Sequence, residues 1–201
     1  MPATTNITAA DALRHLMAGN ARFVANDRQP LSHGVSNAIH DRPIAIVLGC
    51  CDHRVTPETV FDQGLGSLFT IRVAGNIVTP SQMGSIEYGV AEHGTRLIVV
   101  LGHQHCGAIN AALTTEPHPG YASPGLSEIL TTVRNQIGSR QHATATDATD
   151  VQDLMIENVR NSVHQLRTGS ELLANLSQYE GLQIIGAHYS MDTGKVRFLD
   201  R

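Results

Sequence analysis

The sequence has few cysteines, little net charge and no long apolar run, and each of these absences excludes a class of protein. Three cysteines cannot all pair within one chain, and a reducing compartment disfavours disulfides in any case. The net charge of −4 argues against binding to nucleic acid or to an anionic membrane, because both attract basic surfaces. No apolar run approaches the roughly 20 residues that cross a bilayer. The cysteines are therefore packing residues or functional thiolates.

The N-terminal region predicts a helix rather than a targeting signal. Its sequence, MPATTNITAADALRHL, contains no apolar signal-peptide core, so we expect a cytoplasmic protein. Thr8 and Asp11 form a variant of the capping box that begins a helix, which predicts an N-terminal helical arm over residues 1–26. The apolar residues in phase on this helix are Leu13, Leu16, Met17, Phe23 and Val24.

The remaining pattern predicts one α/β domain over residues 1–201. The apolar runs Ile44–Leu48 and Leu97–Leu101 have no polar interruption, which suits strands buried on both faces of a parallel sheet. Two apolar segments flank a turn within residues 182–199 and predict an antiparallel C-terminal hairpin at the sheet edge. We therefore expect a central, mainly parallel β-sheet flanked by helices. The polar stretch 138–149 predicts an exposed connection.

Chemically versatile side chains follow directly after the first apolar run. Side chains alternate in an extended chain, so Cys50, Asp52 and Arg54 can point to one side. Cys51 and His53 then point to the other side. The first set is a candidate site and the second a packing set. An ordinary surface ion pair is the alternative explanation for Asp52 and Arg54.

Two more potential ligands, His103 and Cys106, follow the second run at a predicted strand-to-helix junction. With Cys50 they supply two thiolates and one imidazole, which matches zinc and leaves a fourth tetrahedral position open. Water in that position would have its pKa lowered to about 7, giving a hydroxide nucleophile. The alternative is structural: buried cysteines and a core histidine. Their shared position after the carboxyl ends of strands favours the zinc site, because open α/β sheets place their sites there.

Four short motifs follow one another along the chain and together indicate a known family. Together they resemble the β-class carbonic anhydrases, and the resemblance extends from Gly19–Phe23 to the closing Gly186–Leu199 hairpin. The motifs are C-x-D-x-R at Cys50–Arg54, R-x-A-G-N at Arg72–Asn76, I-E-Y-G-V at Ile86–Val90 and G-H-x-x-C-G at Gly102–Gly107.

The resemblance implies an enzyme, a zinc lyase that hydrates CO2 reversibly to bicarbonate and a proton. It implies zinc ligands at Cys50, His103 and Cys106, and a catalytic dyad of Asp52 and Arg54. It also implies a small apolar CO2 pocket at a subunit interface and a homodimer or homotetramer in which the N-terminal helix lies on a neighbouring subunit. The residues implied for the lining of that pocket are Phe69 and Tyr88.

Several alternatives remain open from the sequence. Asp52 would either orient the zinc-bound hydroxide while Arg54 holds it, or bind zinc and switch the site off. His53 and Asp41 depart from residues common in the family, and an ionised Asp41 would only accept hydrogen bonds. The same site would also suit carbonyl sulfide or carbon disulfide hydrolysis. A non-catalytic zinc- or redox-sensing module, with Asp52 as fourth ligand and Cys51 as a second thiol, is the third hypothesis.

Overall fold

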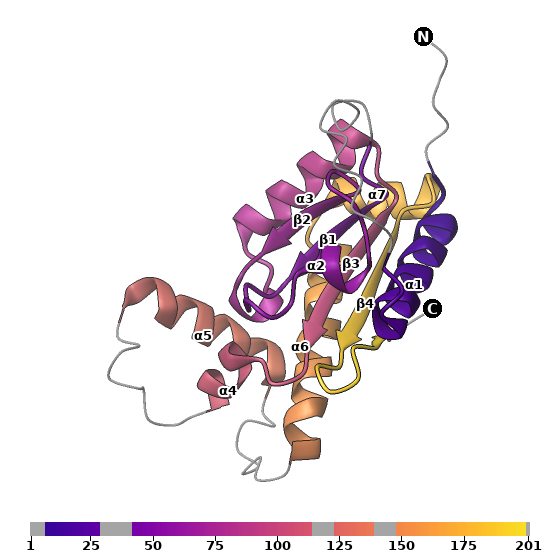
Figure 1. Ribbon diagram of the computed structural model, residues 1–201. Coiled ribbons are helices and arrows are strands. Elements are labelled where there is room, and N and C mark those ends of the chain that lie inside the picture. Colours follow the sequence, from indigo (N-terminus) through magenta and orange to yellow (C-terminus); the bar gives the residue numbers. More distant parts are fainter. Residues whose placement is uncertain (1–6, 29–41, 114–122, 139–147, 200–201) are drawn as a thin grey trace.

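The computed structural model of the protein describes residues 7–28, 42–113, 123–138 and 148–199 (Figure 1). Asp41 and residues 139–147 of the predicted connection 138–149 lie outside these ranges. The helices are α1 (Ala9–Ala25), α2 (Pro57–Val60), the 3-10 turn η1 (Ala74–Asn76), α3 (Pro80–His93), α4 (Gly107–Leu113), α5 (Pro124–Ile137), α6 (Ala148–Thr168) and α7 (Glu171–Tyr179). The strands are β1 (Ala45–Gly49), β2 (Leu68–Arg72), β3 (Leu97–His103), β4 (Gln183–Tyr189) and β5 (Val196–Phe198).

The five strands form one mixed sheet in the order β2-β1-β3-β4-β5. The pairs β1–β2, β1–β3 and β3–β4 are parallel, and β4–β5 is antiparallel. This confirms the predicted fold class, including the hairpin at the C-terminal edge. Every residue of β1 and of β3 is buried, because helices cover both faces of the sheet (Figure 1).

Apolar side chains form three clusters around this sheet. One lies between the sheet and helices α1 and α2, and a second lies on the opposite face under α3, α6 and α7. The third gathers side chains of α4, α5 and α6 beyond the ends of β1 and β3, and it includes Cys50 and Cys106. Two of the predicted metal ligands are therefore enclosed by helices at one end of the sheet. Within the described ranges, none of the helices combines the length and the apolar character needed to span a membrane.

The N-terminal helix begins as predicted, but its buried face is shifted from the predicted one, with Leu13 and Phe23 partly buried against the core. The Thr8 hydroxyl caps it by accepting a hydrogen bond from the Asp11 backbone N–H. Of the five apolar residues expected to be buried, Leu16 is fully buried, whereas Met17 and Val24 are 38% and 39% exposed. The buried stripe consists largely of small residues, which allow close approach to the sheet. Its members are Ala9, Ala12, Leu16, Gly19 and Asn20.

Helix α1 packs on its own chain, and its contact with a neighbouring subunit, implied by the resemblance, stays a prediction. The Asn20 side chain donates to the carbonyls of Val60 and Gly194 at 3.0 and 2.9 Å and accepts from the Val196 backbone N–H at 2.9 Å. One buried amide thus joins α1 to α2 and to the β4–β5 hairpin. This accounts structurally for asparagine in the Gly19–Phe23 motif.

Replacing Gly19 with alanine should destabilise the protein by about 2–3 kcal/mol, because the added methyl would overpack a closed contact. A Cβ at Gly19 would lie 1.8 Å from the Phe61 carbonyl oxygen, which is backbone and cannot move aside cheaply. Gly84 is the matched control, because a Cβ there meets nothing within 4 Å in the exposed middle of α3. Gly84→Ala should stabilise by about 0.5–1 kcal/mol, since alanine favours helix over glycine. Urea unfolding measures the change in stability caused by each substitution. Equal changes for Gly19→Ala and Gly84→Ala would contradict the close contact between Gly19 and Phe61.

Candidate metal centre

Two thiols and one imidazole converge where β1 and β3 end. Gly49 lies opposite Leu101 in the β1–β3 register, so Cys50 leaves β1 beside the end of β3, where His103 stands. Cys106 directly precedes α4. The Cys50 and Cys106 sulfurs are 3.9 Å apart, and the ligand atoms of all three residues lie within 4.8 Å of one another. All three are buried, with 4%, 1% and 2% exposure for Cys50, His103 and Cys106.

This donor set fits a tetrahedral zinc ion. Two zinc–sulfur bonds of about 2.3 Å at a tetrahedral angle place the sulfurs about 3.8 Å apart, close to the separation between the two cysteines. His103 Nδ1 lies 2.9 Å from the Gln104 carbonyl oxygen, which only accepts, so Nδ1 carries the proton and Nε2 presents a lone pair. Nε2 is buried without a hydrogen-bond partner of normal geometry, and its polar neighbour is the Cys50 sulfur. A buried ring nitrogen left in this state is suited to bind a metal ion.

The surroundings already favour thiolate on one of the two cysteines. The hydrogen bond with Cys50 lowers the pKa of Cys106 to about 7, against the effect of burial, and the backbone N–H groups of Ile109 and Ala108 lower it further. The same shared hydrogen bond, together with burial, raises the pKa of Cys50. The shared hydrogen bond therefore makes the two thiols ionise unequally, and a bound cation would favour the thiolate form of both.

Asp52 and Arg54 form an ion pair at the edge of the cluster. Arg54 Nε and one terminal nitrogen donate to the two Asp52 oxygens at 2.9 and 2.7 Å, and the Arg54 backbone N–H donates to Asp52 at 2.9 Å. These hydrogen bonds hold the pKa of Asp52 well below its usual range. The strand ends at Gly49, so a local turn rather than strand alternation brings the two side chains together. The structure thus contains the predicted pair for a different reason.

The neighbouring residues Cys51 and His53 are exposed, although burial and the Cys50 sulfur beside it raise the pKa of Cys51. Cys51 is exposed, and the His53 side chain is 90% exposed, with its Nδ1 3.9 Å from an Asp52 oxygen. His105, between two of the ligands, is exposed in a left-handed backbone conformation. Among the described residues, the group able to hold a metal contains neither Asp52 nor Cys51. This is unlike the arrangement that the sensing hypothesis requires.

Arg72 supports the site and was not singled out from the sequence. Its guanidinium donates to the carbonyl oxygens of Cys50 and Asp52, at 3.0 and 2.6 Å. It thereby fixes the backbone on both sides of Cys51. Arg72 is the first residue of the R-x-A-G-N motif, which marks it in the sequence. The motif does not indicate which groups the arginine contacts.

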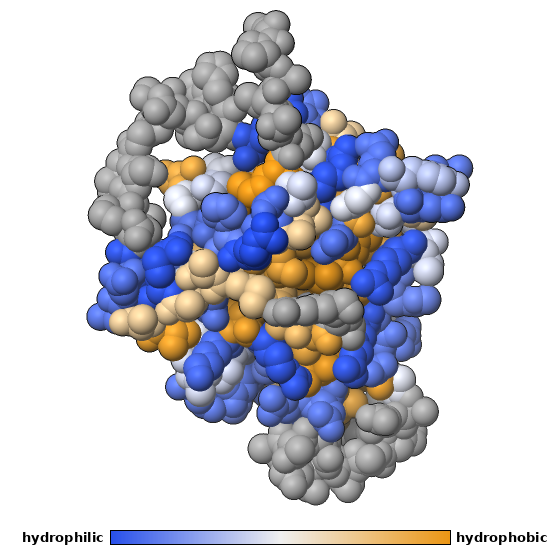
Figure 2. Space-filling model, turned by 90° about the vertical axis from the view of Figure 1, so that its right-hand side faces the viewer, coloured by the Kyte–Doolittle hydropathy of each residue, from blue (hydrophilic) through white to orange (hydrophobic). Residues whose placement is uncertain are grey.

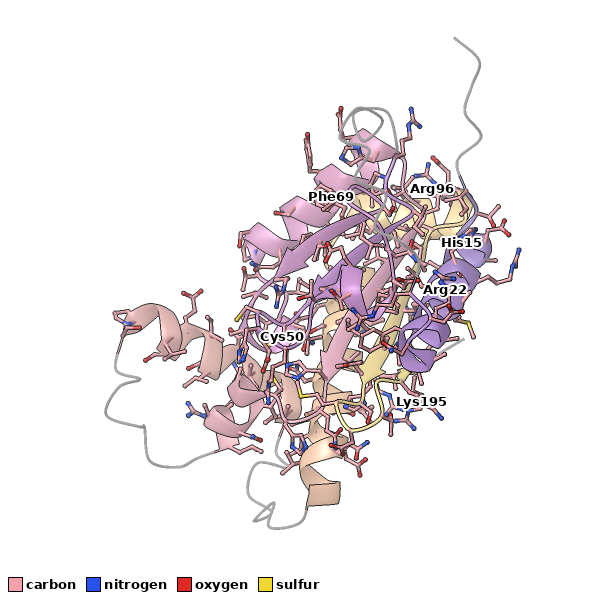
Figure 3. All side chains as sticks on the ribbon, viewed as in Figure 1. His15, Arg22, Cys50, Phe69, Arg96 and Lys195 are labelled. Carbon is pink, nitrogen blue, oxygen red and sulfur yellow. The ribbon has the colours of Figure 1, made fainter. Side chains whose placement is uncertain are left out.

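The two residues expected to line the CO2 pocket lie together but away from the metal cluster of their own chain. The Phe69 and Tyr88 ring centroids are 6.3 Å apart, and His93 packs against both rings. Phe69 lies opposite Ile46, four residues before Cys50 in β1, which corresponds to roughly 13 Å along a strand. Figure 3 shows Phe69 and Cys50 toward opposite ends of the sheet.

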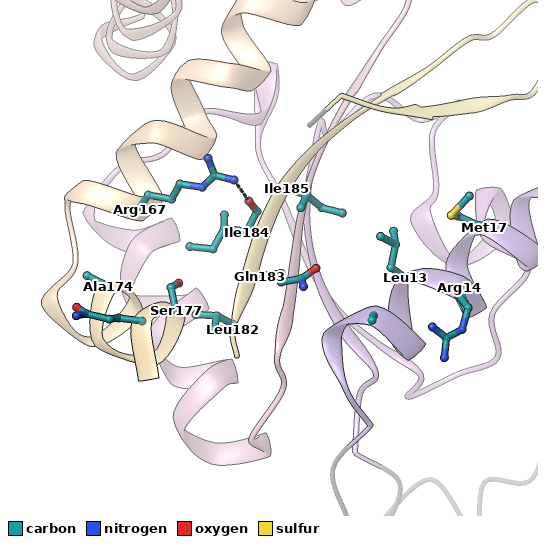
Figure 4. A pocket seen from close by; sticks show the side chains of 12 residues that line it. Leu13, Arg14, Met17, Arg167, Ala174, Ser177, Leu182, Gln183, Ile184 and Ile185 are labelled. Atoms are coloured by element: carbon teal, nitrogen blue, oxygen red, sulfur yellow. Dashed lines mark hydrogen bonds between the residues drawn. The ribbon is translucent and has the colours of Figure 1, made fainter. Parts of the chain in front are cut away.

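A cavity of about 860 Å³ lies elsewhere, between α1, α7 and the first half of β4 (Figure 4). Its lining includes Leu13, Ile184 and Ile185, and the Arg167 guanidinium beside it donates to the Ile184 carbonyl at 2.5 Å. Apolar side chains reach the surface on the side of the molecule that carries α1 (Figure 2). The residues that line this cavity include none of the predicted site residues.

Comparison with known proteins agrees with the fold. The family model described as "Carbonic anhydrase" matches residues 45–196. The chain is 34% identical over 209 residues to carbonic anhydrase 2 of Mycobacterium tuberculosis, covering 100% of this chain and 96% of that protein. A carbonic anhydrase of Mycolicibacterium smegmatis is 35% identical, with 98% and 94% covered.

Solved structures show the same likeness. A β-carbonic anhydrase of Aspergillus fumigatus superposes with a TM-score of 0.73 at 26% identity, covering 82% of this chain and 79% of that one. The β-carbonic anhydrase of Coccomyxa in complex with acetazolamide gives a TM-score of 0.71 at 25% identity, covering 94% and 82%. On the strength of the family model, the full-length relatives and the shared fold, the chain is an enzyme of the β-class carbonic anhydrase family.

Proposed function

We propose that this enzyme interconverts CO2 and bicarbonate at a zinc ion held by Cys50, His103 and Cys106. The observation that carries the proposal is the convergence of two sulfurs and one unpartnered imidazole nitrogen, with sulfurs spaced 3.9 Å apart as zinc requires. Zinc with these three ligands would act as a Lewis acid that lowers the pKa of water in its fourth position to about 7. The side chains beside this ion, Asp52 and Arg54, would orient the water for attack on CO2.

Asp52 is proposed to orient the attacking water. Its carboxylate is ionised and held by two side-chain hydrogen bonds and one backbone hydrogen bond from Arg54. Held in this way, it would accept a hydrogen bond from the water and direct a lone pair at the carbon of CO2. Because Arg54 holds the carboxylate away from the cluster, we propose a resting site in which the fourth position stays open.

We further propose that the enzyme works as a homodimer or homotetramer whose CO2 pocket is shared between subunits. Among the described strands, β2 has a neighbour on one side only, where it pairs with β1. Next to this edge strand, Leu65 and Tyr88 are 70% and 58% exposed. An apolar face beside an unpaired strand edge is suited to a second copy of the chain. The Phe69 and Tyr88 pair of a second subunit would then add to the lining of the CO2 pocket, since within one chain this pair lies away from the metal cluster.

CO2 hydration measured against pH on the zinc-loaded protein tests the function. We expect activity already at neutral pH, because Asp52 is paired with Arg54 and does not occupy the fourth position. A zinc-loaded preparation with no CO2 hydration at neutral or alkaline pH would overturn the proposal. Sulfide release from carbonyl sulfide, measured on the same preparation, should be much slower than CO2 hydration. Faster sulfide release would reassign the substrate without changing the site.

A further inference from the structure

The turn η1 contacts the metal cluster through its backbone. The Val73 backbone N–H donates to the Gly49 carbonyl at 3.1 Å, which holds the start of η1 against the end of β1, next to Cys50. From this place the Gly75 backbone N–H is directed at the Cys50 sulfur and acts to lower the pKa of Cys50, against the larger raising effects of Cys106 and burial. The Asn76 N–H donates to the Val73 carbonyl at 3.0 Å and closes the turn. Gly75 has φ of 72°, a left-handed conformation that glycine adopts without strain at the third position of such a turn. The conformation of η1 thus determines whether this N–H reaches the sulfur.

Two buried side chains of α6 hold η1 in place. Asn158 Nδ2 donates to the Gly75 carbonyl at 2.8 Å, and the Ser162 hydroxyl donates to the Asn76 carbonyl at 3.0 Å. Asn158 is 1% exposed and Ser162 is 0% exposed. Both lie one turn apart on a helix of 21 residues, so they present two donors in fixed positions to consecutive carbonyls of the turn.

The turn has little room to shift by itself. A Cβ added at Gly75 would lie 2.9 Å from a Val133 methyl group of α5 and 3.5 Å from the Ala108 Cβ of α4. The turn is therefore enclosed by helices on one side and tied to α6 by hydrogen bonds on the other. Loss of either tie would leave a buried carbonyl unpaired, and such groups reorganise to find a partner.

We propose that Asn158 and Ser162 are positioning residues of the metal centre, which fix η1 so that the Gly75 N–H donates to the Cys50 sulfur. A hydrogen bond to a metal-bound thiolate withdraws electron density from the sulfur. The sulfur then donates less charge to the metal, and the metal remains a stronger Lewis acid. The inference rests on the proposed function to the extent that Cys50 binds a metal.

Cadmium-113 substitution tests the proposal without using activity. In the cadmium-loaded protein, the Gly75 amide proton should show scalar coupling to the metal, transmitted through the hydrogen bond and the sulfur. Failure of cadmium to bind the three ligands would refute the metal site itself. Cadmium bound by Cys50, His103 and Cys106 without any coupling to Gly75 would refute only the further inference.

Two substitutions then test the role of α6. Asn158→Leu keeps the branching and the number of side-chain heavy atoms but removes the donor, and Ser162→Ala removes the hydroxyl with little change in volume. Both should weaken the coupling, shift the cadmium resonance and lower zinc affinity, by about tenfold for Asn158→Leu. Ser162→Ala, the milder change, decides the question if Asn158→Leu fails to fold. Unchanged coupling and resonance in the folded variants would overturn the proposal.

Asn161 provides a matched control on the same helix. Its Nδ2 donates to the Gln136 carbonyl at 2.5 Å, at the end of α5, and to a Glu157 carboxylate oxygen at 3.2 Å, and neither of these partners belongs to η1. Asn161→Leu therefore removes the same kind of hydrogen bond from the same helix. It should leave the Gly75 coupling, the cadmium resonance and zinc affinity unchanged. An equal effect of Asn161→Leu would mean that general loosening of α6, and not the tie to η1, is responsible.

Discussion

Replacing Cys106 with serine should lower kcat/KM for CO2 hydration by at least about a thousandfold, because a serine hydroxyl does not ionise near neutral pH and zinc is lost with the thiolate. Cys106 is 2% exposed, and its sulfur lies 3.9 Å from that of Cys50. Zinc content by mass spectrometry and CO2 hydration by stopped flow should fall together. The wild-type protein should also gain thermal stability from zinc, by about 4 kcal/mol at a thousandfold excess over the dissociation constant, and the variant should not.

Cys51 is the control for this substitution. It is the same residue type, adjacent to a proposed ligand, but its side chain is exposed. Cys51→Ser should change stability by no more than about 0.5 kcal/mol, as for most surface substitutions, and should retain zinc and activity. Full zinc content in Cys106→Ser, or zinc loss in Cys51→Ser, would mean that the ligand assignment is wrong.

Replacing Asp52 with asparagine should lower kcat by about 10²–10⁴-fold while zinc content stays at the wild-type level. Asparagine keeps the shape but loses the negative charge, so it no longer pairs with Arg54 and accepts a weaker hydrogen bond from water. Retained metal with lost turnover separates the role of Asp52 from that of the ligands. Loss of zinc in Asp52→Asn would instead make Asp52 part of the metal site.

The adjacent histidine is the control for Asp52. The His53 side chain is 90% exposed, although its Nδ1 lies 3.9 Å from an Asp52 oxygen. His53→Ala should leave kcat nearly unchanged in a well-buffered assay. A fall as large as that of Asp52→Asn would assign proton transfer to His53.

The pH dependence follows from the same ion pair. Arg54 holds the pKa of Asp52 below its usual range, so the carboxylate is charged at every pH above about 4. A lowered pKa means that the stabilising contribution is present above the unfolded-state pKa and is lost as pH falls through the lower folded-state value. Asp52 therefore should not titrate near neutral pH, and a change of activity in that range would be due to another group, such as water bound in the fourth position of zinc. In Arg54→Leu the Asp52 pKa should move up toward its ordinary value, and acid unfolding should begin at higher pH.

Much of the fold could be predicted because its strongest signals are local. The uninterrupted apolar runs of β1 and β3 indicated strands covered on both faces, and the structure has helices on both faces. The start of α1 at the Thr8 cap was also predicted from the sequence. The buried face of α1 was partly wrong because apolar size was used as the criterion, whereas Gly19 and Asn20 are buried by close approach and by hydrogen bonds across the fold.

The site was predictable to the extent that it lies on short motifs. Cys50, His103 and Cys106 follow strand ends, and the structure brings them together. The supports of the cluster were not predictable, because Asn158 and Ser162 are separated from their partners by 83 and 86 residues along the chain. In the sequence, both look like ordinary polar residues of a helix. Their hydrogen bonds to η1 become evident only from the packing of α6 against that turn.

The alignment of β1 with β3 has a consequence for the order of events during folding. Gly49 stands opposite Leu101, and the ligands extend from the two strands just beyond that point. A slip of one residue between the strands would displace Cys50 by about 3.3 Å, farther than a bond to a metal tolerates, and would exchange the faces of the slipped strand. Refolding molecules should therefore capture cobalt only after these strands have found their native partners, and the colour of the cobalt–thiolate bond would record that moment.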